Sequence, residues 1–517
     1  MAVSGVMAQG SNIQWAKCLG GYLDDGANSI MQTSDSGYIV AGNTYSKDVF
    51  VPVNHGVGDF WLAKLYANGF IQWQKSLGGS ESDIAYSIQQ TNDGGYIIAG
   101  KSSSNDFDIS GGHHGNWNSD AWIVKITSNG TLQWQRSLGG TKDEEARAIL
   151  QTDDGGYIVA GTAMSIDGDL SGTAVVEDID YWVVKLGVSG AIQWQKRLGG
   201  SMPDYATSIQ KTTDGGYIVA GYSGSHDGDV TGNHGGTDYW IVKINSIGTI
   251  LWQQSLGGTG NEEAYAIQQT KDGGYIVGGC SPSNDGDVTG HHDTVYYNLD
   301  YWIVKLDVSG ILEWQKSLGG INNEVANSIQ QTHEGGYIIA GYSASKDGDV
   351  TGHHDNPSSS YVNDSWVVKL DTSGNLLWQK SLGGTNNDGA SSIYVTNDRG
   401  YIVAGWTESI DGDIAGKIGG SGTNDVWVVK LTQDPTGVDE IPTISISISP
   451  NPTTGIITIK GISQPTVEVY NLMGQKLVAA QNTNEVSLAN LPMGLYLVQV
   501  YSKDMELVKS EKVILQK

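Results

Sequence analysis

Acidic residues return at one position of a repeated pattern. Each stands two residues before an alanine that opens the pattern A-x-S-I-Q-Q-T or a close variant of it: Asp25, Asp83, Glu144, Asp204, Glu262, Glu324 and Asp388. Arranged around an axis, these residues would form a ring of carboxylates able to bind a cation or another ligand. The alternative is structural, because Asp and Glu at turns commonly accept backbone N–H bonds, here from the Gly-Gly loop before each acid.

A second acidic motif, S-x-D-G-D-[VLI]-x-G, occurs in five repeats. Its paired acids are Asp167 and Asp169, Asp227 and Asp229, Asp285 and Asp287, Asp347 and Asp349, and Asp411 and Asp413, with Asp106 and Asp108 as a degenerate copy. Two carboxylates around a glycine resemble the start of a calcium loop, so calcium is the cofactor that these loops could bind. The further ligands of an EF-hand are missing, which leaves a plain Asx-type turn as the alternative.

Histidines and catalytic motifs add little to this chemistry. Adjacent histidines lie in the same loops: His113 and His114, His291 and His292, and His353 and His354. They could bind zinc, but no cysteine or fixed third ligand accompanies them. The chain has no G-x-S-x-G, H-E-x-x-H, Walker loop or dinucleotide fingerprint, and we therefore assign no catalytic residue.

The aromatic residues follow the same repeat. Of the 16 tryptophans, 14 recur in two series: Trp61, Trp122, Trp182, Trp240, Trp302, Trp366 and Trp427, and Trp15, Trp73, Trp134, Trp194, Trp252, Trp314 and Trp378. Their regular placement favours packing between neighbouring sheets over a surface for sugar stacking. Trp117 and Trp406 fall outside the pattern, so we treat them, with the seven acids, as candidate ligand-binding residues.

The repeat that positions these residues is about 60 residues long and occurs seven times. Each copy predicts four strands: one over 85–91, an Asp-Gly turn, one over 95–100, a long polar loop, then D-x-W-x-x-K-[LI], a Ser-Gly or Asn-Gly turn, and I-x-W-x-K-S-L-G-G. Repeated four-stranded sheets predict an all-β fold, a seven-bladed β-propeller. The fourth-strand tryptophan series begins with Trp15, before the first complete copy, and has no member after the last third strand. Residues 12–21 should therefore pair with residues 425–431 and close the last blade.

This strand order resembles that of WD-repeat propellers, although the WD dipeptide and the histidine of that family are absent. The segment from Asp371 to Trp378 also resembles the tryptophan-docking motif of quinoprotein dehydrogenases, but their adjacent cysteine pair is missing: Cys18 and Cys280 fall in different repeats. The resemblance implies blade packing only. In either case the long loops share one face of the propeller, the long-loop face, where binding residues are expected to concentrate.

Charge limits the classes of partner. The formal net charge is −27, and it lies on residues 1–440, because residues 441–517 hold six lysines against five acids. Such a field repels phosphate backbones and anionic membrane surfaces, so we expect no nucleic-acid partner. No apolar run reaches the length of a transmembrane segment. We also expect the protein to be a monomer.

The C-terminal segment has its own signature: SPNPTTG at 449–455, VYNLMG at 469–474, and a strand over 491–500 with Gly-x-Tyr. These motifs resemble the type A sorting domain of type IX secretion substrates, with Pro450, Asn451, Pro452, Gly455, Gly474, Gly494 and Tyr496 at the matching positions. The resemblance implies an Ig-like β-sandwich, a Bacteroidota-type host, and the type IX machinery and its sortase as partners. It also implies export across the outer membrane.

We therefore expect four segments: a signal-peptide remnant at 1–11, the propeller at 12–432, a linker at 433–442 and the sorting domain at 443–517. The leading hypothesis is a secreted or cell-surface binding or adhesion protein whose ligand, a glycan or a protein, binds at the long-loop face. The alternatives are a surface polysaccharide- or peptide-degrading enzyme that uses acids of that face, and a structural surface-layer component.

Overall fold

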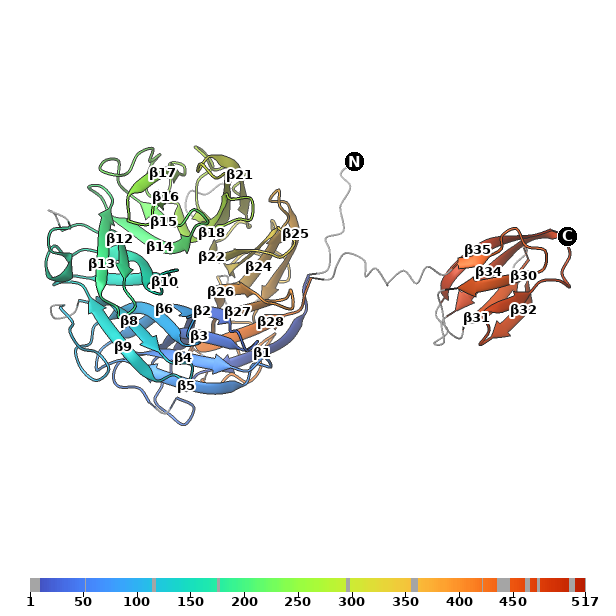
Figure 1. Cartoon of the computed structure of the whole chain (residues 1–517), viewed down its shortest axis with the longest axis horizontal. Coiled ribbons are helices and arrows are strands. Elements are labelled where there is room, and N and C mark those ends of the chain that lie inside the picture. The colour runs from blue at the N-terminus through green and yellow to red at the C-terminus, as the bar shows by residue number, and fades with distance from the viewer. Residues whose placement is uncertain are drawn as a thin grey trace. The chain divides into compact units, whose positions relative to one another are not determined.

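The chain divides into two compact units, Met1–Asp434 and Pro435–Lys517. The computed structural model describes residues 10–51, 53–113, 118–173, 177–293, 298–354, 361–420, 422–434, 447–460, 465–471, 475–501 and 507–516. In the first unit, the described residues form seven four-stranded antiparallel sheets, and Figure 1 shows these sheets following one another around a common centre. The prediction of an all-β fold built from repeated, blade-like sheets is confirmed.

The first and second strands of each sheet form a hairpin, and the first strand lies nearest the centre (Figure 1). The first strands are β2 (Asp25–Gln32), β6 (Asp83–Gln90), β10 (Glu144–Gln151), β14 (Asp204–Lys211), β18 (Glu263–Gln269), β22 (Glu324–Gln331) and β26 (Asp388–Val395). The second strands are β3 (Tyr38–Thr44), β7 (Tyr96–Ser102), β11 (Tyr157–Ala163), β15 (Tyr217–Ser223), β19 (Tyr275–Ser281), β23 (Tyr337–Ser343) and β27 (Tyr401–Thr407). The Asp-Gly turn between them needs a left-handed residue, such as Gly94 at φ 79°.

The third and fourth strands form a second hairpin on the outer side of each sheet. The third strands are β4 (Asp59–Leu65), β8 (Asp120–Ile126), β12 (Asp180–Leu186), β16 (Asp238–Ile244), β20 (Asp300–Leu306), β24 (Asp364–Leu370) and β28 (Asp425–Leu431). The fourth strands are β5 (Ile71–Leu77), β9 (Leu132–Leu138), β13 (Ile192–Leu198), β17 (Ile250–Leu256), β21 (Leu312–Leu318) and β25 (Leu376–Leu382). One 3-10 turn, η1 (Gly168–Leu170), lies in the long loop after β11.

The hydrophobic core lies between the sheets rather than at their common centre. Each pair of consecutive sheets encloses one apolar cluster, and the first and last sheets enclose another, which includes Val40, Trp61 and Val428. The third-strand tryptophans are almost fully buried, and Tyr239 donates its hydroxyl to the carbonyl of Trp302 in the next sheet at 2.9 Å. The prediction that the repeated aromatics pack between sheets is confirmed for the third-strand tryptophans and the tyrosines that open the second strands, while fourth-strand tryptophans such as Trp73 are half-buried against the same clusters.

The N-terminal strand β1 (Ile13–Leu19) takes the fourth position in the last sheet. It pairs antiparallel with β28, from Ile13 opposite Leu431 to Leu19 opposite Val426. The order of that sheet is β1-β28-β27-β26, whereas every other sheet of the unit is continuous in sequence.

The second unit contains two small antiparallel sheets among its described residues. One sheet is formed by β29 (Ser447–Ser449), β30 (Ile456–Lys460) and β33 (Glu485–Ser487), and the other by β32 (Lys476–Gln481), β31 (Thr466–Tyr470), β34 (Gly494–Tyr501) and β35 (Leu507–Leu515). Alternating residues of both sheets, such as Ile457 and Val498, form one buried apolar cluster. Over the whole described part of the chain, no helix has the length and apolar character to cross a bilayer.

Candidate functional site

The seven repeated acids lie at the start of the first strands, with six as the first strand residue and Glu262 just before β18. All seven are at most 1% exposed. Asp83 is typical: its Oδ2 accepts the N–H of Gly79 at 2.7 Å and the hydroxyl of Ser104 at 3.1 Å. Burial raises the pKa of Asp83, and likewise that of Glu324, to about 7. This placement favours the structural interpretation, since the carboxylates tie the Gly-Gly loop to the sheet instead of facing solvent.

Each of these acids meets a second carboxylate, the aspartate that opens a third strand in the preceding sheet, and this aspartate is buried in every case except Asp180. Around Gly257, a Cβ would come within 2.4 Å of Glu262 Oε2 and 2.7 Å of Asp238 Oδ1, so only glycine fits between the two groups. Asp238 Oδ1 is buried and accepts no hydrogen bond from the described protein atoms. The like charge of Asp238 adds to burial in raising the pKa of Glu262.

Histidines of the long loops bridge neighbouring sheets. His292 Nδ1 lies 2.7 Å from Asp300 Oδ2 in its own sheet, and its Nε2 lies 3.3 Å from Asp349 Oδ2 in the next. His234 and His354 repeat this arrangement. The hydrogen bond to Asp300 raises the pKa of His292. In the described residues no group of three or more His, Cys, Asp or Glu side chains has the geometry of a metal site, and His114 lies outside those residues.

The D-G-D acids dock the long loop onto the Gly-Gly loop. Asp285 Oδ1 accepts the N–H of Thr259 at 2.8 Å, while the N–H of Asp287 donates to the carbonyl of Gly257 at 2.9 Å. Gly286, at φ 60°, supplies the left-handed turn between them. The same bonds recur at Asp167 and Asp169, Asp227 and Asp229, Asp347 and Asp349, and Asp411 and Asp413. This geometry favours the turn interpretation over a calcium loop.

A different set of residues gathers where the first strands begin and the second strands end, next to the long loops. Three positions there vary between otherwise similar repeats: the residue after the acid, the residue after the alanine, and the next-to-last residue of the second strand. Ten of these side chains form what we call the inner-edge cluster: Tyr86, Lys101, Glu145, Arg147, Tyr205, Tyr222, Glu263, Tyr265, Tyr342 and Trp406. Nine are half-buried and Arg147 is exposed.

One side of the inner-edge cluster is charged. Glu145 pairs with Lys101 at 2.6 Å and with Arg147 at 2.5 Å. The Arg147 guanidinium lies 4.1 Å from the ring centroid of Tyr86. These contacts bring together side chains of β6, β7 and β10, and they neutralise the Glu145 carboxylate within the protein.

The other side of the cluster is aromatic. Tyr205 and Tyr222, opposite each other in register, stack with centroids 5.0 Å apart and an interplanar angle of 27°. The hydroxyl of Tyr265 donates to the carboxylate of Glu263. Trp406 packs over Gly389, whose Cβ would lie 2.8 Å from the indole. Trp406 therefore occupies the equivalent inner-edge position of the last sheet, whereas Trp117 lies outside the described residues.

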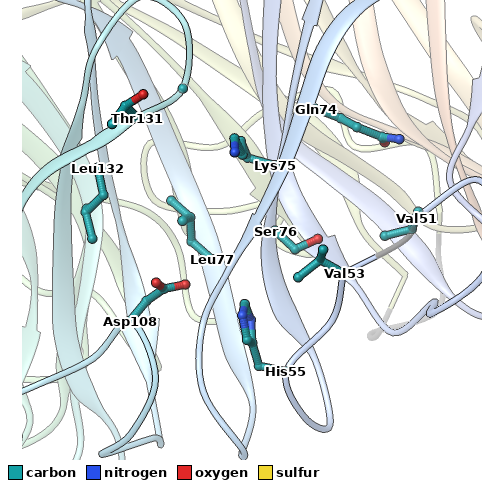
Figure 2. A pocket seen from close by; sticks show the side chains of 11 residues that line it. Val51, Val53, His55, Gln74, Lys75, Ser76, Leu77, Asp108, Thr131 and Leu132 are labelled. Atoms are coloured by element: carbon teal, nitrogen blue, oxygen red, sulfur yellow. The ribbon is translucent and has the colours of Figure 1, made fainter.

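A pocket of about 520 Å³ lies elsewhere, between the first two sheets (Figure 2). Val51, Val53 and Leu132 form apolar walls, and His55 and Asp108 supply polar groups. His55 Nδ1 already bonds Asp59 Oδ2 at 2.7 Å. One polar group of this pocket is thus already engaged inside the protein.

In the second unit, the sorting-motif residues support its fold. Asn451 joins the end of the chain, since its Nδ2 donates to the carbonyl of Lys512 at 2.8 Å and its Oδ1 accepts the N–H of Ile514 at 3.0 Å. The Tyr496 hydroxyl donates to the carbonyl of Pro492 at 2.6 Å. Gly455 has a φ of 147°. Pro450 and Pro452 flank Asn451, Gly494 opens β34, and Gly474 lies outside the described residues.

Comparison with known proteins gives one family match. Residues 447–516 match the family described as "Secretion system C-terminal sorting domain". The regulatory protein FlaEY of Caulobacter vibrioides is 23% identical over 282 residues, which cover 52% of this chain and 28% of that protein. The chain thus spans little more than a quarter of this curated relative.

Two solved structures are similar at low identity. PorZ, a surface component of the type IX secretion system of Porphyromonas gingivalis, is 12% identical, covers 95% of this chain over 59% of its own and has a TM-score of 0.39. The Pan2 WD40 domain of Neurospora crassa is 11% identical, covers 68% of this chain over 91% of its own and has a TM-score of 0.36. From its C-terminal domain, the chain is a type IX secretion substrate, exported to the cell surface or the extracellular space.

Proposed function

We propose that this exported protein is a closed seven-bladed β-propeller, residues 12–432, that binds an extracellular ligand, with an Ig-like sorting domain at residues 443–517. The pairing of β1 with β28 and the apolar cluster between the first and last sheets support the closed ring. A propeller closed in this way completes its last sheet with four strands like the others, leaves only short outer edges and suits a monomer exposed outside the cell.

The inner-edge cluster is the observation that supports binding. The third-strand tryptophans and the tyrosines that open the second strands are buried between sheets, whereas at the inner edges Tyr205, Tyr222, Tyr342 and Trp406 keep part of their rings in solvent, as fourth-strand tryptophans such as Trp73 also do. Half-exposed rings beside charged groups offer flat apolar contact together with hydrogen bonds, the combination that binding sites for glycans and protein side chains use. The cluster adjoins the long loops, in agreement with the expectation that ligand binds at the long-loop face.

The enzyme hypothesis receives less support. The seven acids of the long-loop face, which the enzyme would use, are buried and hydrogen-bonded, and Glu145 is paired with two cations. A glycoside hydrolase needs two carboxyl groups that reach the same bond. The surface-layer hypothesis leaves the half-exposed aromatics without a role. On the secretion pathway, the sortase of the type IX system would act on the C-terminal domain.

A glycan and protein array tests the proposal. Wild-type protein should bind a defined set of spots, and the double variant Tyr222→Ala, Trp406→Ala should lose them while still unfolding in one cooperative transition, at a melting temperature lowered by several degrees. A matched control is Tyr66→Ala, which removes a tyrosine 53% exposed in the turn between β4 and β5, away from the cluster. No binding by the wild type would favour the surface-layer hypothesis, and turnover of a bound polysaccharide or peptide would favour the enzyme.

A further inference from the structure

Two glutamates occupy the same repeat position in different sheets of the inner-edge cluster. Glu145 follows the acid of β10, and Glu263 follows the acid of β18. Glu145 is neutralised by Lys101 and Arg147. Glu263 forms no ion pair with any lysine, arginine or histidine of the described residues, and its recorded side-chain partner is the Tyr265 hydroxyl. The two positions therefore differ in their neighbours: Glu145 has Lys101 and Arg147 where Glu263 has the tyrosines Tyr222 and Tyr265.

One tyrosine hydrogen-bonds Glu263, and three more tyrosines of the inner-edge cluster lie on the two neighbouring sheets. Tyr265 donates to it, Tyr205 and Tyr222 stack in the preceding sheet, and Tyr342 belongs to the following sheet. Burial raises the pKa of all four phenols, and the negative charge of Glu263 adds to the effect on each of them. All four rings thus lie within electrostatic reach of one carboxylate, and their hydroxyls stay protonated at neutral pH.

A carboxylate among aromatic rings is suited to a positively charged ligand. Aromatic faces attract cations through their quadrupole, and a half-buried carboxylate adds a charge-assisted hydrogen bond. The negative field of the first unit also concentrates cations near its surface. A metal ion does not fit this set of groups, since one carboxylate and phenol rings supply too few oxygen ligands for calcium or magnesium.

We propose that Glu263 and its four tyrosines bind an organic ammonium group of the extracellular ligand. This inference rests on the proposed binding function and names the chemistry that the inner-edge cluster recognises. The ammonium belongs to an amino sugar or to a lysine side chain, both of which carry a primary amine on a flexible or ring carbon. The ammonium donates hydrogen bonds to Glu263 and contacts the tyrosine faces.

Calorimetric titration of the full chain at low ionic strength tests this inference. The probes are a glucosamine oligosaccharide and a short lysine peptide, each beside its N-acetylated form. We expect one amine probe to bind, its N-acetylated form to bind at least about tenfold more weakly, and added salt to weaken binding. The probe that binds identifies the source of the ammonium.

Variants separate the site from its surroundings. Glu263→Gln should weaken binding at least about tenfold, as N-acetylation does, while Glu145→Gln, the matched change at the cation-paired position, should keep it. Tyr265→Phe, which retains the ring, should have a smaller effect than Glu263→Gln. Melting temperatures near the wild-type value show that each variant is folded.

Three results overturn the inference: equal binding of the acetylated probes, full binding by Glu263→Gln, or no binding of either amine. In each case, array binding that depends on Tyr222 and Trp406 would leave the proposed binding function in place. If the wild-type protein bound neither the amine probes nor any spot of the array, the proposed binding function would be overturned as well.

Discussion

The surfaces between the sheets and the inner edges of the same sheets follow opposite rules. Between the sheets, the same residue types recur seven times, as in the tryptophans equivalent to Trp302 and the buried acids equivalent to Glu324. At the inner edges, the residue after the acid is glycine, isoleucine, valine, tyrosine or glutamate, depending on the sheet. The pairing register of the first and second strands is nevertheless the same from sheet to sheet.

This contrast separates packing from recognition. A position that must fit an identical neighbour in every sheet has one solution, so it repeats. A position that faces the centre does not have to fit an identical neighbour in every sheet and is free to differ, which allows one sheet to carry a carboxylate without a cation from the protein and another a neutralised one. Perturbing the repeated positions should therefore change stability, and perturbing the inner edges should change binding.

Removal of β1 is the largest expected perturbation of the packing region. Without residues 10–20, β28 becomes an open edge and the last apolar clusters lose Cys18 and Leu19. We expect a large fall in melting temperature and concentration-dependent aggregation, measured by calorimetry and light scattering. Removal of residues 435–517, which form a separate unit, should leave the main transition in place. An unchanged transition after loss of β1 would contradict ring closure.

Truncation of one repeated tryptophan should have the next largest effect. Trp302→Ala empties a fully buried site between two sheets and should cost about 3–5 kcal/mol in the free energy of unfolding, measured with urea. Trp406→Ala, at the half-buried inner edge, should cost about 1–2 kcal/mol and affect ligand binding instead. Similar losses for both variants would remove the distinction between the regions.

The buried acids should make stability depend on pH. Glu324 has a pKa of about 7 in the folded protein against an ordinary 4.5, so the folded state binds the proton more tightly. Stability should fall as the pH rises from about 4.5 through 7, by roughly 1.4 kcal/mol for each unit of pKa difference. The raised pKa of His292 acts in the same direction, because its stabilising charge is lost as the pH rises.

The measurement is the melting temperature between pH 8 and pH 5, which should rise as the pH falls. Glu324→Gln should reduce the slope. Asp35→Asn serves as control, because hydrogen bonds from Thr33 and Lys64 outweigh burial and hold the pKa of Asp35 at about 2, so its contribution is lost only below about pH 4. A flat profile, or one that rises toward pH 8, would show that the acid pairs carry no excess proton affinity.

Calcium should have the smallest effect. Since the D-G-D carboxylates already accept backbone N–H bonds, about 10 mM calcium, enough to fill weak extracellular sites, should shift the melting temperature by no more than about 1 °C. Asp285→Asn, which weakens the bond to Thr259, should lower the melting temperature by more than that. A larger calcium shift, lost when Asp285 and Asp287 are both changed to Asn, would restore the calcium-loop interpretation.

The repeat made the sheets predictable, because alternation, Asp-Gly turns and tryptophan spacing each define a strand or its end. First strands such as β2 begin two residues earlier than the alanine suggested, since the acid itself pairs in the sheet. The inner-edge cluster was harder to predict. Its residues are marked by differing between copies, and contacts such as Arg147 to Tyr86 depend on which sheets are neighbours in space. Trp406 was recognised because it departs from the pattern in the same way.

The pairing of β1 with β28 also limits the order in which the sheets of the first unit can be completed. The N–H of Asn12 bonds the side chain of Thr432, 420 residues later. β1 therefore has no partner until nearly all seven repeats have been made, and contacts of such long sequence separation form slowly. During that interval the last sheet stays incomplete, because β1 and β28 are not yet paired. The last sheet can therefore be completed only after the final repeat has been made.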